Sequence, residues 1–222
     1  MKLSAILLSK VIAFIDTVEM LPTGGLYAPD FVRDVALQFE FQKFPQTLEE
    51  FNVQKGMDFL TGRVGKGVIG KLSIWPNILV IEARHNTAEC QDMLNEILHW
   101  AAMKFNLKFD SDMIARYAFV SDISFTSDVP LLTFDPLLQK IANQVSASVS
   151  ETWKEAIRYE QFDFKIGHDP LSRKWGIAPF QIARLVEHRF TENHYFSEAP
   201  VPTDLHIKLI EEYEKGISER LR

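Results

Sequence analysis

The chain has 222 residues, 46% hydrophobic and 24% charged, a composition typical of a folded globular protein that excludes an intrinsically disordered chain. Its formal net charge of −6 argues against general nucleic-acid binding, which depends on neutralising phosphates with Lys and Arg, although a local basic patch stays open. The single cysteine, Cys90, excludes an intramolecular disulfide framework and favours a reducing compartment.

The N-terminal run MKLSAILLSKVIAFIDT is apolar but is interrupted by Lys10 and Asp16. A secretory signal or a membrane span needs a longer uninterrupted apolar stretch, so we expect a cytoplasmic protein without membrane association. Both faces of residues 11–17 are largely apolar, which predicts a buried central strand.

Residues 21–57 show turn and helix signals. LPTGG at 21–25 indicates a turn, and Asp30 after Pro29 predicts the cap of a helix that extends to about Phe39. FEFQKFP at 39–45 alternates and ends in proline, which favours a short edge strand. Thr47 with Glu50 matches a capping box for a brief helical turn.

The stretch from Asp58 to Phe105 predicts three short strands followed by the best-marked helix of the chain. Asn86 with Glu89 three residues later matches a capping box. The helix that follows places five apolar residues on one face: Leu94, Ile97, Leu98, Ala101 and Phe105. Cys90 falls early in this helix, where the helix dipole would lower its pKa, but cysteine is so often buried that we favour a core position.

The second half has a similar pattern. A strand with Tyr117, Phe119, Ile123 and Phe125 on one face precedes a helix started by Asp135-Pro136, whose predicted inward residues are Leu138, Ile141, Ala142, Val145 and Val149. Further predicted strands span 161–166 and Phe180 to Val186, with GHDPLSRKWG at 167–176 as a loop. SEAPVPT leads to a final helix capped by Thr203, with Leu205, Leu209, Tyr213 and Ile217 inward.

These elements predict an α+β fold in which helices pack on one face of an antiparallel sheet. The element orders β-α-β-β-β-α and β-α-β-β-α further predict a degenerate duplication of a β-α-β-β-(β)-α unit. We expect one α+β half at 1–110 and another at 111–222, packed together as one compact unit.

A nucleotide loop is unsupported, although Gly65 to Lys71 satisfies G-x-x-x-x-G-K. The next residue is Leu72 rather than Ser or Thr, and a strand pattern follows where a P-loop needs a helix. The most basic region of the chain surrounds this segment. It is a candidate interface or binding site for an anionic partner, with the candidate residues Lys55, Arg63, Lys66, Lys71 and Trp75. The alternative is a solvated sheet edge.

His and carboxylate residues gather between Glu187 and His206. They are residue types that bind metals, but no two histidines have the i, i+4 spacing that places both on one helix face. The sequence therefore predicts no metal site and no cofactor. It also contains no nucleophile elbow and no H-E-x-x-H motif, so no catalytic residues are predicted and we lean against an enzyme.

Two predicted strand ends carry similar charged residues. Paired acidic and basic side chains at these ends could line a shared cleft or form surface ion pairs worth about 0–1 kcal/mol each. The candidate cleft residues are Glu82, Arg84, His85, Glu187, His188 and Arg189.

Three functions stay open. The first is a non-catalytic interaction or scaffold protein, a subunit of a cytoplasmic assembly whose partner is itself or another protein; its candidate anchors are Trp75, Trp153, Trp175 and Tyr195. The second is a small-molecule binding module with a groove between the two halves. The third, ranked last, is a metal-dependent hydrolase built from a loop between His188 and His206.

Overall fold

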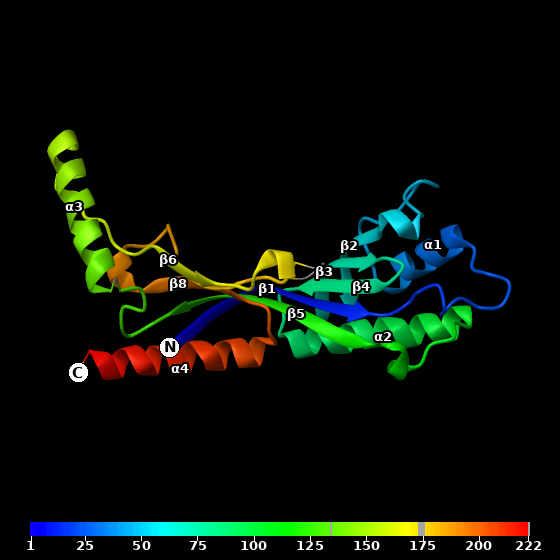
Figure 1. Cartoon of the computed structure of the whole chain (residues 1–222). Coiled ribbons are helices and arrows are strands. Elements are labelled where there is room, and N and C mark those ends of the chain that lie inside the picture. The colour runs from blue at the N-terminus through cyan, green and yellow to red at the C-terminus, as the bar shows by residue number, and fades with distance from the viewer. Residues whose placement is uncertain (134, 173–175, 222) are drawn as a thin grey trace. The chain divides into compact units, whose positions relative to one another are not determined.

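A computed structural model of the chain describes residues 1–133, 135–172 and 176–221. These residues contain four α-helices and eight strands, and the strands form an antiparallel sheet in the order β2-β3-β4-β1-β5-β8-β7-β6 (Figure 1). The predicted α+β class with an antiparallel sheet is confirmed. Trp175, one of the expected anchors, lies outside the described residues.

The chain divides into two compact units. The first unit comprises Ile6–Asp122 and Pro200–Ile207, and the second comprises Met1–Ala5, Ile123–Ala199 and Lys208–Arg222. Three elements therefore contribute residues to both units: β1 (Lys2–Phe14), β5 (Arg116–Thr126) and α4 (Thr203–Arg220).

The first unit contains a three-strand meander. After β1, the elements of this unit are, in chain order, α1 (Ala28–Gln38), the 3-10 turn η1 (Val53–Lys55), β2 (Met57–Val64), β3 (Gly67–Ile74), β4 (Ile78–Ala83), α2 (Thr87–Phe105) and η2 (Ser111–Met113). The meander consists of β2, β3 and β4. β4 pairs antiparallel with β1, and buried Val11 of β1 lies opposite buried Ile81 of β4. The apolar character of residues 11–15 follows from this central position.

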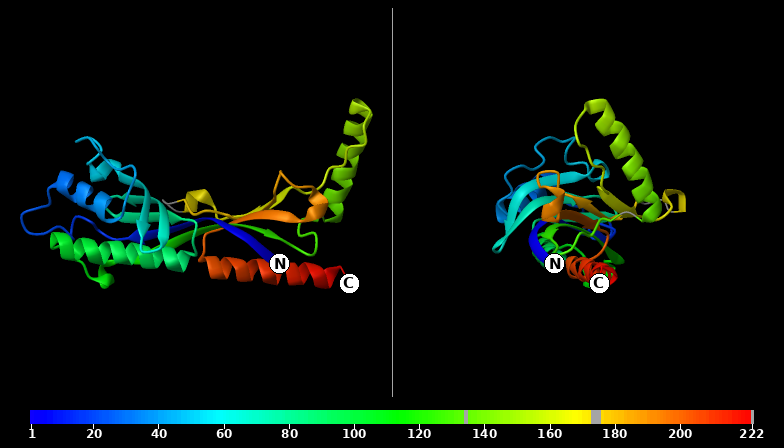
Figure 2. Two further views of the ribbon diagram at one scale, coloured as in Figure 1. Left: turned by 180° about the vertical axis from the view of Figure 1, so that it is seen from behind. Right: turned by 90° about the vertical axis from the view of Figure 1, so that its left-hand side faces the viewer.

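Two helices of the first unit enclose its core. α2 runs along the strands in both figures and contacts β4 and β2 (Figures 1 and 2). α1 packs on α2 through Phe31 against Phe105 and Phe39 against Trp100, with ring centroids 5.1 Å apart in each pair. The predicted capping box of Asn86 and Glu89 is confirmed, and so is the burial of Leu94, Ile97, Leu98 and Ala101.

The second unit has the same kinds of elements. After β5 come α3 (Pro136–Trp153), β6 (Asp163–Ile166), η3 (Pro170–Ser172), β7 (Phe180–Arg184), η4 (Phe190–Glu192), β8 (His194–Ala199) and α4. Its buried core includes Ile123, Phe125, Leu131, Ile182, Tyr195 and Ile210. Asp135 caps α3 as predicted, because its carboxylate accepts the N–H groups of Leu137 and Leu138.

The structure corrects two local predictions in the first unit. Residues 39–45 form no strand, and only an isolated bridge joins Lys43 to Leu60. The N–H of Phe41 still donates to the carbonyl of Ala36, so the chain is leaving α1 where the alternating pattern predicted an edge strand. Asp30 does not cap α1; it lies within the first turn, after an N-cap at Tyr27.

The predicted inward face of α4 is displaced by one residue. Leu205 and Leu209 are exposed, whereas His206 and Ile210 are buried, and Ile217 is buried as predicted. The preceding strand β8 was not predicted, because its residues were interpreted as a connection into the helix. Thr203, at the first position of α4, is buried on the same face as His206 and Ile210.

Cys90 lies in the core of the first unit, as favoured from the sequence. Burial raises the pKa of its thiol to about 11, and Sγ donates a hydrogen bond to the carbonyl of His85 at 3.9 Å. The helix start therefore does not activate this thiol, since loss of hydration disfavours the thiolate.

We expect Cys90 of the native protein to react with a thiol reagent such as DTNB at pH 8 at least about 100-fold more slowly than the same thiol in 6 M urea. Absorbance of the released thiolate measures both rates. Rapid stoichiometric labelling of the native protein would contradict a buried thiol.

Candidate functional site

The basic region is less cationic than its sequence indicates. Lys71 Nζ lies 2.9 Å from Asp58 Oδ2 across the β2–β3 pair, and Lys55 Nζ lies 2.5 Å from Glu49 Oε1. Arg63 and Lys66 are exposed at the β2–β3 hairpin, where Gly65 has a positive φ of 55° and β3 follows directly. Trp75 covers the backbone of Gly56. Arg63 and Lys66 thus lie at the turn of the β2–β3 pair, whereas Lys55 and Trp75 lie at its opposite end, so the structure does not gather the five residues into one patch.

The candidate cleft residues of the first unit are engaged locally. Glu82 Oε1 lies 2.7 Å from Lys10 Nζ, its antiparallel partner on β1. His85 accepts the N–H of Val68 at 3.3 Å and faces Glu89 at 3.3 Å, whereas Arg84 is exposed. Glu187 and Arg189 are exposed in the second unit. They follow β7, whereas Glu82 and Arg84 lie at the end of β4.

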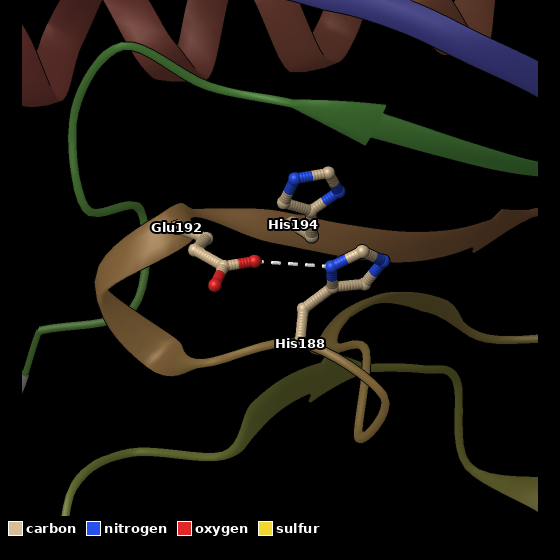
Figure 3. A group of neighbouring side chains, drawn as sticks. All are labelled: His188, Glu192 and His194. Carbon is tan, nitrogen blue, oxygen red and sulfur yellow. Dashed lines mark hydrogen bonds and ion pairs between the residues drawn. The ribbon is translucent and has the colours of Figure 1, made fainter.

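The turn from Leu185 to His194 brings together three residues whose side chains can bind a metal ion. Ligand atoms of His188, Glu192 and His194 all lie within 4.8 Å of one another, and His188 Nδ1 is 3.1 Å from Glu192 Oε2 (Figure 3). The rings of His188 and His194 stack with centroids 3.8 Å apart and an interplanar angle of 6°.

A metal site built from a loop between His188 and His206 is the last-ranked alternative from the sequence, because no spacing predicts that a loop gathers these residues. The chain reverses within η4 and leaves it through Asn193, which has a positive φ of 51°. This reversal places the first residue of β8 beside His188. Asn193 was the available signal, since asparagine tolerates the left-handed conformation better than most residues.

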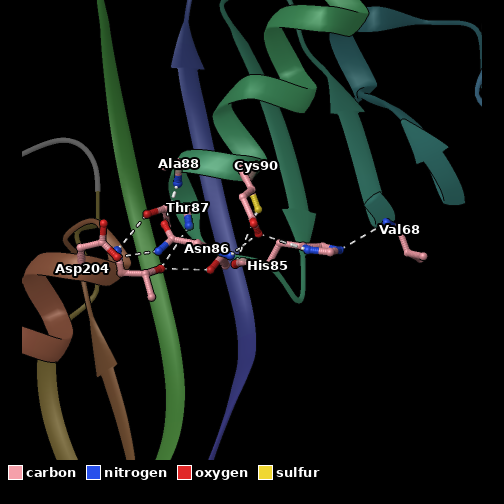
Figure 4. A network of polar contacts seen from close by, with 10 residues as sticks. Val68, His85, Asn86, Thr87, Ala88, Cys90 and Asp204 are labelled. Carbon is pink, nitrogen blue, oxygen red and sulfur yellow. Dashed lines mark hydrogen bonds and ion pairs between the residues drawn. The ribbon is translucent and has the colours of Figure 1, made fainter. Parts of the chain in front are cut away.

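A buried polar network joins the starts of α2 and α4 within the first unit (Figure 4). The N–H of Thr87 donates to Thr203 Oγ1 at 3.2 Å, and the N–H of Thr203 donates to Thr87 Oγ1 at 2.8 Å. Ser9 Oγ lies 3.3 Å from Thr203 Oγ1, and Asn86 donates to Asp204 at 2.6 Å. The hydroxyl of each threonine accepts the backbone N–H of the other threonine, which has no acceptor within its own helix. This role is structural.

An apolar cavity of about 230 Å³ lies wholly within the first unit. Phe31 and Val35 of α1, Leu98 and Ala101 of α2, and Leu72 of β3 line it, and Thr17 is the polar residue among its lining side chains. A cavity of this kind excludes ions and favours an apolar guest.

The inward face predicted for α3 is wrong. Of the five residues predicted to be inward, only Ala142 is buried, whereas Ile141 is 55% exposed and Leu138 and Val145 are also exposed. Leu138, Ile141 and Val145, spaced by three and four residues, form what we call the α3 stripe. Figure 1 shows α3 standing clear of β6 and β8.

One side of α3 is covered by the segment that follows it. The N–H of Tyr159 donates to Ser146 Oγ at 2.9 Å, and the N–H of Ile157 donates to Ser150 Oγ at 2.9 Å. The α3 stripe lies to one side of this contact on the helix surface. Trp153 at the end of α3 is 70% exposed, as an anchor should be, whereas the expected anchor Tyr195 is fully buried.

Comparison with known proteins identifies no relative: no protein-family model matches this sequence, and no curated protein matches it. None of the helices within the described residues is both long enough and apolar enough to cross a membrane.

His206 is a titratable group inside the first unit. It is fully buried, its Nδ1 lies 3.2 Å from Ser121 Oγ, and burial lowers its pKa from 6.5 to about 4. The unfolded chain therefore binds more protons than the folded chain between pH 4 and 6.5. Stability from the neutral imidazole is complete above pH 6.5 and is lost as the pH falls towards 4.

We expect the free energy of unfolding to fall between pH 6.5 and pH 4 by on the order of 2–3 kcal/mol more in the natural protein than in the His206→Gln variant. Urea unfolding at several pH values measures this difference, and glutamine keeps a polar group near Ser121 without titrating in this range. Equal pH dependence in both proteins would contradict the assignment to His206.

Proposed function

We propose that the chain is a non-catalytic interaction subunit of a cytoplasmic assembly, and that it pairs with a second copy of itself through the α3 stripe. The observation that carries this proposal is the exposure of the stripe on an 18-residue helix. Apolar residues at helical spacing normally face a core, and an exposed stripe of this kind is typical of an interaction surface.

We also propose that the two halves arose by duplication. With β8 included, residues 2–105 and 116–220 have the same order, β-α-β-β-β-α. The strand order β2-β3-β4-β1 of the first run corresponds to β6-β7-β8-β5 of the second. Buried residues recur 116 positions apart around the last strand and helix of each run, in the pairs Ala83 and Ala199, Thr87 and Thr203, Cys90 and His206, Leu94 and Ile210, and Ala101 and Ile217.

This correspondence makes α1 the counterpart of α3. α1 buries Val32, Val35 and Ala36 within its own unit, whereas α3 buries only Ala142. The helix that completes a core in one run therefore presents its apolar face outward in the other. Such a difference between corresponding elements supports an intermolecular role for α3.

The charges of α3 favour a second copy, packed antiparallel, as the partner. Lys140 lies in the first half of α3 and Glu151 in the last, and both are exposed. An antiparallel pair centred on Val145 places Ile141 opposite Val149 and brings each Lys140 to the level of the partner's Glu151 along the helix axis, outside the apolar contact. A parallel pair would instead bring like charges together.

We expect sedimentation velocity of the full chain to show a dimer. Ile141→Asp should raise its dissociation constant by about 30-fold or more, because a charge replaces a central apolar contact worth about 2 kcal/mol. Asn143→Asp adds the same charge to the opposite side of α3, where Asn143 is exposed, and should leave the dimer intact.

Charge reversal tests the orientation of the pair. Lys140→Glu and Glu151→Lys should each weaken the dimer, and the double variant should restore it. A natural protein that stays monomeric at about 100 μM, or equal weakening by Asn143→Asp, would overturn pairing through the stripe.

The cavity of the first unit supports a second candidate function, the binding of a small apolar molecule. About 230 Å³ accommodates a short aliphatic chain or a small aromatic ring system. This cavity lies within one unit, so a small molecule that binds there needs no groove between the two halves.

A series of n-alkanols from hexanol to dodecanol should raise the thermal midpoint of the natural protein, with a maximum at the chain length that fills the cavity. Saturation at 100 times the dissociation constant adds about 2.7 kcal/mol of stability. Ala101→Phe fills the cavity and should abolish the shift, whereas Ala147→Phe on the exposed surface of α3 should not. The same shift in both variants would exclude this cavity as the site.

A further inference from the structure

We propose that His188, Glu192 and His194 form a binding site for a divalent transition-metal ion of the zinc type. Two imidazoles and one carboxylate form a donor set that suits Zn²⁺, Co²⁺ and Ni²⁺. This site is independent of the α3 stripe and of the apolar cavity.

The distances allow coordination after small side-chain movements. Donors around a tetrahedral Zn²⁺ lie about 3.2–3.5 Å apart, given metal–ligand distances of about 2.0–2.2 Å. The His188 and Glu192 atoms are 3.1 Å apart, and the atoms of all three residues lie within 4.8 Å of one another. The side chains of His188 and Glu192 are 36% and 47% exposed, so they can rotate without disturbing a core.

The stacked imidazole rings must separate for the metal to bind. Parallel stacked rings hold their nitrogen lone pairs in two separate parallel planes, whereas a bound ion requires lone pairs that converge. Rotation of the exposed His188 ring about its side-chain torsions achieves this convergence, and Glu192 already faces that ring (Figure 3). Coordination then replaces the ring contact between the two imidazoles.

The backbone that carries the three ligands is held in place at both ends. The N–H of Leu185 donates to the carbonyl of His194 at 3.1 Å, and the N–H of His188 donates to the carbonyl of Leu185 at 3.2 Å. The N–H of Glu192 donates to the carbonyl of Arg189 at 2.9 Å. The ligands therefore start from fixed Cα positions, which lowers the entropic cost of gathering them.

Arg184 anchors the middle of this turn from the interior. Its side chain is 4% exposed, Nη1 donates to the carbonyl of Phe190 at 2.8 Å, and the guanidinium lies 4.4 Å from the centre of the Phe190 ring. The hydroxyl of buried Tyr195 donates to Asn193 Oδ1 at 3.2 Å. A buried cation and a buried phenol thus support an exposed turn.

The three ligands leave a tetrahedral ion one coordination position, which faces solvent because His188 and Glu192 are exposed. An open fourth position is the arrangement of zinc sites that bind or activate a further ligand, whereas structural zinc sites have four protein ligands. The cation would also carry positive charge onto the turn between β7 and β8.

Isothermal titration of the full chain with ZnCl₂ at pH 7.5 should show one zinc ion per chain. Glu192→Gln, His188→Ala and His194→Ala should each weaken binding by at least about tenfold, since each removes a ligand. His168→Ala removes an exposed histidine of the same unit outside the cluster and should bind zinc as the natural protein does. Circular dichroism checks that each variant is folded.

Co²⁺ gives an independent signature of the ligand set. Titration with CoCl₂ should produce the visible absorption of a four- or five-coordinate ion, and His194→Ala should lose it. Absence of stoichiometric zinc binding, or equal loss in His168→Ala, would overturn the site.

Discussion

The first unit depends on the way in which two buried helix starts satisfy each other. α2 and α4 both begin with a threonine whose backbone N–H has no intrahelical acceptor, and burial removes water as the alternative. Thr87 and Thr203 exchange hydrogen bonds between amide and hydroxyl, and Ser9 of β1 lies against the same hydroxyl. Side-chain caps of this kind contribute about 1 kcal/mol each. Thr203, His206 and Ile210 follow one another at helical spacing on one face of α4, and all three are fully buried.

Features that depend on neighbouring residues could be predicted from the sequence. The capping box at Asn86 and the Asp135-Pro136 helix start involve contacts within four residues, and both are present. The inward face of α2 could also be predicted, since its apolar residues recur at helical spacing and a sheet covers them. The spacing of apolar residues indicates that one face of a helix is apolar, but it does not indicate which element covers that face. The same argument therefore gave the wrong inward face for α3.

The remaining features depend on contacts that spacing does not encode. Strand β8 was missed because HYFSEA alternates weakly and precedes a proline-rich run, although pairing with β7 defines it in the structure. The gathering of His188 and His194 depends on the reversal through Asn193 and on the anchoring of Phe190 by Arg184. The sequence does not indicate that Arg184 anchors this turn from the interior, since arginine is seldom buried and the Arg184 side chain is only 4% exposed.

The division of the chain between its units has a consequence for synthesis on the ribosome. The first unit takes most of its residues from Ile6–Asp122 but also requires Pro200–Ile207, which carries Thr203. A nascent chain that has released Asp122 therefore still exposes the start of α2 without its partner. The first unit becomes complete only after residue 207 has emerged, so residues 6–122 wait during the synthesis of the whole intervening segment before their fold can be completed.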